Sequence, residues 1–167
     1  MDLTHFSLFS CGASQPGADE LVFSDSSLVD LCSKILSIKD EEGRSSFDLV
    51  STIRAKRMCG CGRTNLSVGY DGQIYPCHML HDEKYAKGNL YVDFDKEADL
   101  HSAIYDSGPC GKSVDEIEHC KDCSVRYVCG GGCRARSFFA TGDVDKEDPY
   151  CILMKEYYGK VFSGISG

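Results

Sequence analysis

The sequence lacks the features of a secreted or membrane protein. None of its apolar runs approaches the roughly 20 residues that a transmembrane helix needs. The N-terminus, MDLTHFSLFSCGASQPGADE, has no basic segment and no sustained apolar core, so no secretory signal is predicted. Internal repeats and low-complexity stretches are absent as well. We therefore expect a cytoplasmic protein without a membrane partner.

The sequence also has little positive charge. Its 18 Lys and Arg residues face 26 Asp and Glu residues, which gives a net charge of −8. Phosphate binding needs basic surface, so nucleic acid is not expected as the main partner. The hydrophobic content of 42% and charged content of 26% are ordinary for a globular protein. At 167 residues the chain can form one domain with a core, or one domain with an appendage.

Cysteine, in contrast, is abundant. The chain has 11 cysteines, an odd number that cannot all pair, and thiols stay reduced where there is no export. A disulfide framework is therefore not expected. The cysteines crowd near the C-terminus as Cys120-x2-Cys123-x5-Cys129-x3-Cys133-x17-Cys151, with Cys110 just upstream. Such density is typical of a zinc or iron–sulfur site.

The cysteines divide into two groups of four. Glycines 130–132 let the backbone bend sharply between Cys129 and Cys133, so Cys133 is expected to serve a different centre. One predicted group is Cys120, Cys123, Cys129 and Cys151; the other is Cys59, Cys61, Cys77 and Cys133. Zinc ribbons usually separate two Cys-x2-Cys pairs by roughly 15–20 residues, a spacing that is missing here. Cys11, Cys32 and Cys110 have no partner at a convincing spacing, and Cys32 is expected in the core.

The patterns predict a small α+β fold with a β-hairpin and short helices. The hairpin spans Leu66–Cys77, and its Asp71-Gly72 pair suits a type I′ turn. Asp148-Pro149 predicts the start of a helix over Tyr150–Phe162, and Asp25 or Ser26 is expected to cap a helix over Ser27–Lys39. The acidic stretch Asp143–Asp148 is expected to be exposed. The other predicted elements are a strand at Thr4–Ser10 and helices at Phe47–Met58, Lys96–Tyr105 and Arg134–Ala140.

Residues 59–151 resemble the SPASM domain, the auxiliary-cluster region of many radical S-adenosylmethionine (radical SAM) enzymes. The resemblance rests on the cysteine spacings and on the strings Asp-Gly-Gln-Ile-Tyr-Pro-Cys77 and Cys129-Gly-Gly-Gly-Cys-Arg-Ala. It implies two [4Fe–4S] clusters. Cluster one would be bound by Cys59, Cys61, Cys77 and Cys133, and cluster two by Cys120, Cys123, Cys129 and Cys151. If Cys61 is not a ligand, cluster one has an iron open to substrate.

The chain also departs from that family. Radical SAM enzymes bind their catalytic cluster through Cys-x3-Cys-x2-Cys, a motif that this sequence lacks. The resemblance thus implies a fragment or subunit that does not cleave S-adenosylmethionine alone and works with a separate radical SAM barrel. Residues 1–46 resemble the last strand and helix of a partial (β/α) barrel, residues 47–162 the auxiliary domain, and residues 163–167 a tail. His78 replaces the aspartate of the sulfatase-maturing branch, which favours a peptide or protein substrate of the maturase kind.

Two functions follow from these patterns. The first is an auxiliary iron–sulfur domain that relays electrons or binds substrate for a radical SAM peptide maturase. The second is a module in which zinc holds the fold together and no redox step occurs. Arg126, Arg134 and Arg136 flank the cysteine run, where they either offset the negative charge of thiolate-bound clusters or are solvated.

Overall fold

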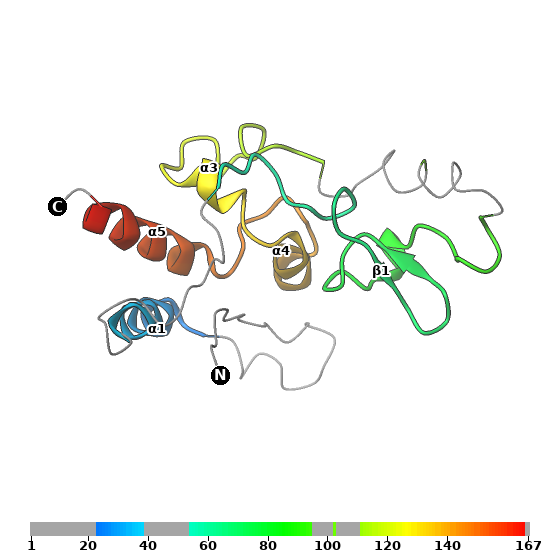
Figure 1. The fold of residues 1–167 in the computed structure, drawn as a ribbon, viewed down its shortest axis with the longest axis horizontal. Helices are drawn as coiled ribbons and strands as arrows, with labels where there is room; N and C mark the ends of the chain where they lie inside the picture. The colour runs from blue at the N-terminus through cyan, green and yellow to red at the C-terminus, as the bar shows by residue number, and fades with distance from the viewer. Residues whose placement is uncertain (1–22, 39–53, 95–101, 103–110, 166–167) are drawn as a thin grey trace.

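The computed structural model describes residues 23–38, 54–94, 102 and 111–165 (Figure 1). The predicted strand at Thr4–Ser10, nearly all of the predicted helix at Lys96–Tyr105, and the cysteines Cys11 and Cys110 lie outside these residues. Among the described helices, none is long and apolar enough to cross a bilayer. The elements in chain order are α1 (Asp25–Ser37), β1 (Ser67–Val68), β2 (Ile74–Tyr75), the 3-10 helix η2 (Glu83–Tyr85), α3 (Arg126–Cys129), α4 (Arg134–Thr141) and α5 (Cys151–Ile165).

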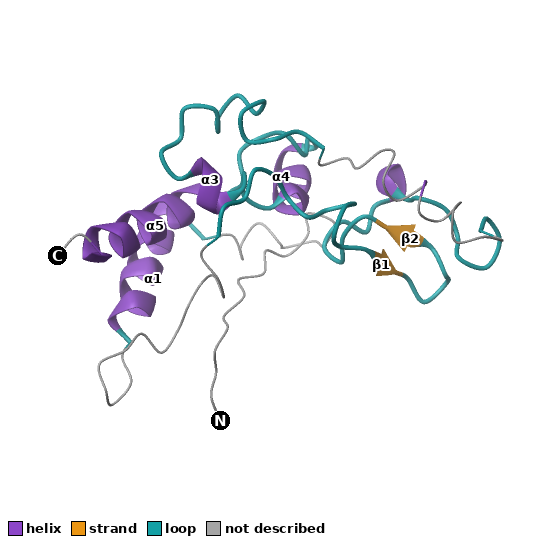
Figure 2. Cartoon of the chain, turned by 45° about the horizontal axis from the view of Figure 1, so that its top comes forward, coloured by secondary structure: helices purple, strands orange, loops and turns teal. Residues whose placement is uncertain are grey.

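Helices α1 and α5 lie side by side at one end of the molecule (Figures 1 and 2). Leu28, Cys32 and Ile35 recur at helical spacing and bury one face of α1, as the pattern predicted. The cap differs from the prediction, because Ser24 rather than Asp25 or Ser26 accepts the hydrogen bond from the Ser27 N–H. Helix α5 ends at Ile165, so residues 163–165 are helical and not part of a tail.

The hairpin lies at the opposite end, with β1 and β2 antiparallel (Figure 2). The pairing is confirmed, but the turn is not type I′, which requires a positive φ at both central residues. Only Gly72 has one, at +82°. The Gly69 N–H donates to the Gln73 carbonyl at 2.8 Å, so three residues form the loop and Gly72 occupies its left-handed position.

Between the two ends, residues 54–65 pass α3 and continue to the hairpin (Figure 1). Residues 54–58 are not helical, contrary to the helix predicted over Phe47–Met58. Their backbone bonds to distant segments instead: the Lys56 N–H donates to the Tyr127 carbonyl at 2.5 Å, and the Arg57 carbonyl accepts from Val114 at 2.7 Å. The helix predicted at Arg134–Ala140 is confirmed as α4.

The described residues bury three apolar clusters. The largest joins α1 to α5 through Leu28 and Cys32 on one side and Leu153, Tyr157 and Tyr158 on the other. A second surrounds Cys61, Cys77 and Leu80, and a third is formed by Val114, Ile117 and Cys120. The first cluster thus joins a helix of the predicted barrel remnant to a helix of the predicted auxiliary domain.

Candidate metal centres

The four cysteines predicted for cluster two line one cavity. Cys120 and Cys123 belong to the loop before α3, Cys129 ends α3, and Cys151 begins α5. One loop and the ends of two helices therefore bring four thiols to a common space. His119, Gly131, Gly132, Asp148 and Lys155 are among the other residues of the wall.

Burial disfavours the thiolate form of three of these cysteines, Cys120, Cys129 and Cys151. It raises the pKa of Cys120 and Cys129, and it raises the pKa of Cys151 to about 12, helped by a hydrogen bond with Glu147. The backbone N–H groups of Gly132 and Gly131 act in the opposite direction on Cys129, because they hydrogen-bond its sulfur. Metals bind the thiolate form. A metal at this site would therefore displace protons from the buried thiols.

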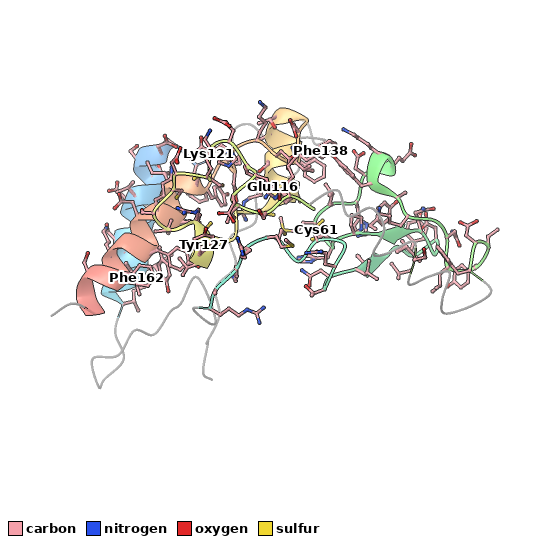
Figure 3. All side chains as sticks on the ribbon, turned by 90° about the horizontal axis from the view of Figure 1, so that it is seen from above. Cys61, Glu116, Lys121, Tyr127, Phe138 and Phe162 are labelled. Atoms are coloured by element: carbon pink, nitrogen blue, oxygen red, sulfur yellow. The ribbon has the colours of Figure 1, made fainter. Side chains whose placement is uncertain are left out.

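The cysteines predicted for cluster one gather in the second apolar cluster. Cys61 and Cys77 are buried there, with Cys59 and Cys133 packed against it. Cys61 lies near the middle of the molecule, between Tyr127 and the hairpin (Figure 3). Its side chain hydrogen-bonds Cys77, and this bond together with burial raises the pKa of the Cys77 thiol.

Two neighbouring residues contact the sulfur of Cys77. The Met79 N–H donates to the Cys77 sulfur at 3.5 Å, and the exposed His78 places Nδ1 3.8 Å from the same atom. Hydrogen bonds to cluster sulfurs are one of the means by which proteins set cluster potentials.

The thiols are gathered, but they are not arranged as ligands around a metal. Within the described residues, no three Cys, His or acidic side chains have metal-binding geometry. The nine cysteines in this part of the chain are thiols and form no disulfides. The assignment of individual ligands therefore stays a prediction.

A buried arginine near Cys120 indicates whether an anionic cluster would suit this site. The Arg134 side chain is fully buried, and its Nε and Nη2 find no hydrogen-bond partner among the described residues. Its charge opposes the effect of burial on the pKa of Cys120. Its Nη1 donates to the Val144 carbonyl at 3.2 Å and lies 3.9 Å from a carboxylate oxygen of Asp145, a long ion pair. A buried cation that is only weakly paired is unfavourable. Negative charge from a thiolate-bound cluster near Cys120 would offset it, so the residues fit the group.

The sequence pattern did not predict a second charged contact, between Asp148 and Arg136. Asp148 belongs to the acidic stretch predicted to be exposed, yet only 2% of it is accessible to solvent. Its carboxylate accepts from Arg136 Nε at 2.8 Å and Nη2 at 2.6 Å. It also accepts from the Cys133 N–H at 2.6 Å and the Tyr150 N–H at 2.9 Å. Its place before Pro149 predicted the helix cap correctly, but no local pattern predicted the contacts to Arg136 and Cys133.

Asp148 lies between the two predicted centres. It holds the backbone of Cys133 from one group, and its carbonyl accepts from the N–H of Cys151 in the other at 2.8 Å. Arg136 is therefore paired rather than solvated, and its guanidinium stacks on Tyr150 at 4.7 Å. Arg126 contacts Asp115 at 3.5 Å and lies over Tyr127 at 4.4 Å.

The structure gathers two groups of four cysteine thiols that are buried or partly buried. Comparison of the sequence with known proteins identifies relatives. The chain is 30% identical over 138 residues to a PqqA peptide cyclase of Bradyrhizobium diazoefficiens, covering 75% of this chain and 35% of that protein. It is 28% identical over 100 residues to mycofactocin maturase MftC of Mycobacterium ulcerans, covering 57% and 25%. With an AdoMet-dependent heme synthase of Methanosarcina barkeri the identity is 32% over 85 residues, covering 48% and 22%.

These relatives are radical SAM family members. The chain spans 35% or less of the length of each of the three. No family model matches it. The resemblance to radical SAM enzymes is therefore supported by relatives, whereas the specific SPASM assignment stays a prediction.

Proposed function

We propose that this chain is an auxiliary iron–sulfur domain that serves a radical SAM enzyme in the modification of a peptide or protein. The observation that carries the proposal is the lining of one cavity by Cys120, Cys123, Cys129 and Cys151. The separate gathering of Cys59, Cys61, Cys77 and Cys133 supports a second centre. The relatives, which include a peptide cyclase and a maturase, support the peptide substrate.

In this proposal each group of four cysteines holds one [4Fe–4S] cluster, and the clusters relay an electron or bind a substrate group. The protein supplies burial, which limits access of water, and N–H donors at Cys77 and Cys129, which stabilise negative charge on sulfur. Asp148 and Arg136 hold the backbone between the two groups. S-adenosylmethionine would be bound by a barrel elsewhere in a longer protein or in a partner subunit. Reduced thiols are stable in the cytoplasm, the compartment we propose.

The test is the iron, sulfide and zinc content of the chain after anaerobic reconstitution. About eight iron and eight sulfide per chain are expected for two cubane clusters. Cys123→Ala should lose about half of both, since one cluster loses a ligand. The matched control is Cys32→Ala, because Cys32 is buried in the α1–α5 core and belongs to neither group. Full iron in Cys123→Ala would refute the ligand assignment, and zinc without sulfide would leave a structural module.

A further inference from the structure

A second opening, separate from the cluster-two cavity, lies along residues 54–65. It is a groove of about 720 Å³, within the range of ligand-binding clefts. Arg54, Lys56, Arg57 and Arg63 contribute four positive charges to its wall, and none of the described residues that line it is acidic. This concentration is notable in a chain whose net charge is −8.

Three of these four charges are not neutralised by the described residues. Arg57 pairs with Asp115 at 2.7 Å. Arg54 and Lys56 have no ion pair in the described part of the chain. The Arg63 side chain donates to the sulfur of Met58, an uncharged atom, and has no ion pair with a described residue. Unpaired cations in a concave wall attract anions more strongly than cations scattered over a flat surface.

The groove also touches both predicted centres. Cys59 of the first group and Cys129 of the second are part of its wall, as are Gly130 and Gly132. The Lys56 side chain packs close to Gly130, where an added Cβ would lie 3.0 Å from the Lys56 Cβ. A ligand in the groove would therefore lie beside cysteines of both groups.

We infer that this groove binds an acidic segment of the peptide substrate, which rests on the proposed function and deepens it. Carboxylates of the segment pair with Arg54, Lys56 and Arg63, and the side chains of Thr64 and Asn65 offer hydrogen bonds to its backbone. A nucleic acid is disfavoured because the described residues of the wall include no aromatic side chain to stack on bases, and the net charge repels a long polyanion.

The test measures anisotropy of a fluorescein-labelled octapeptide of alternating Glu and Gly with the reconstituted full chain. The acidic peptide should bind at about 0.05 M salt and weaken strongly at about 0.5 M. A Lys-Gly octapeptide should not bind. The triple variant Arg54→Gln, Lys56→Gln and Arg63→Gln should weaken binding about tenfold, from three exposed ion pairs.

The matched control removes three positive charges outside the groove, through Lys34→Gln, Lys121→Gln and Lys160→Gln. It should change the affinity less than about twofold. Arg54→Gln alone should weaken binding about twofold, and this single variant replaces the triple variant if the latter does not fold. The Arg54 side chain is exposed and has no ion pair among the described residues.

Three results would overturn the inference: no binding by the wild type, equal weakening in the control, or equal binding of an eight-residue oligothymidine. Iron and sulfide are measured on the same samples. If the protein contains iron and sulfide but does not bind the peptide, the groove inference is refuted and the proposed function is not. If the protein contains no iron and sulfide, the proposed function itself is refuted.

Discussion

Replacing Asp148 with alanine removes the most highly connected side chain between the two cysteine groups. The carboxylate is 2% exposed and accepts from two Arg136 nitrogens and from the N–H groups of Cys133 and Tyr150. The variant leaves the Arg136 guanidinium, of which 13% is exposed, without its counter-ion. It also removes the cap of α5.

The expected loss of stability follows from these contacts. Breaking a buried ion pair by removing one partner costs about 3–5 kcal/mol. Loss of a helix cap costs about 1 kcal/mol by itself, but the two effects share one side chain and are not additive. We therefore expect Asp148→Ala to lower the free energy of unfolding by about 3–5 kcal/mol. Iron should also be lost from both centres, because the Asp148 side chain accepts from the N–H groups of Cys133 and of Tyr150, the residue before Cys151.

The assay is anaerobic urea unfolding of the reconstituted chain, followed by circular dichroism. The control is Glu118→Gln, which breaks the exposed pair with Lys121 at 2.7 Å and should cost less than about 0.5 kcal/mol. Adding Arg136→Met to Asp148→Ala removes the cation that lost its counter-ion, and should restore at least about 1 kcal/mol of the free energy of unfolding. The reasoning fails if Asp148→Ala costs less than about 1 kcal/mol or if the double variant is no more stable.

Three further substitutions test local features. Gly132→Ala should cost at least about 2 kcal/mol, because φ is +72° and the new Cβ would lie 2.7 Å from a buried carboxylate side chain. Gly142→Ala, at φ +78° in open space, should cost only about 1 kcal/mol; equal losses in urea unfolding would contradict the steric argument. Tyr158→Phe should cost about 1 kcal/mol, because it removes the 3.1 Å hydrogen bond to the Val128 carbonyl. Burial raises the pKa of Tyr158 from 10.0 to about 12. The stabilisation of the folded state by the neutral Tyr158 side chain is therefore complete below pH 10 and is lost as the pH rises toward 12. A stability–pH curve of the phenylalanine variant should lack that alkaline loss, and an unchanged curve would exclude Tyr158 as its source.

Some local structure was predictable because it depends on neighbours in the chain. The apolar spacing in α1 and the Asp148-Pro149 start of α5 are examples. The turn of the hairpin was not predictable from Asp71-Gly72 alone. Ile74 also bonds to residues 87 and 88, and this third segment helps to fix where the pairing ends.

The helix predicted over Phe47–Met58 is wrong at residues 54–58 for a similar reason, and residues 47–53 lie outside the described part of the chain. The backbone of Lys56 and Arg57 bonds to Tyr127 and Val114, residues more than fifty positions away, in place of its own helical turn. No pattern within a short window contains that information. The sequence pattern therefore did not predict the groove that these residues line, although the basic residues themselves are evident in the sequence.

The cysteine spacings and the glycines at 130–132 predict two groups of four ligands, because short spacings limit how far a loop can reach, and the assignment of ligands stays a prediction. The tertiary structure brings each group together, in one cavity and in one apolar cluster. It alone decided that Asp148 is buried on Arg136, that Arg134 is buried without full partners, and that the basic side chains face a common groove. Burial and pairing of charges depend on contacts between distant segments, and such contacts exist only after the chain has folded.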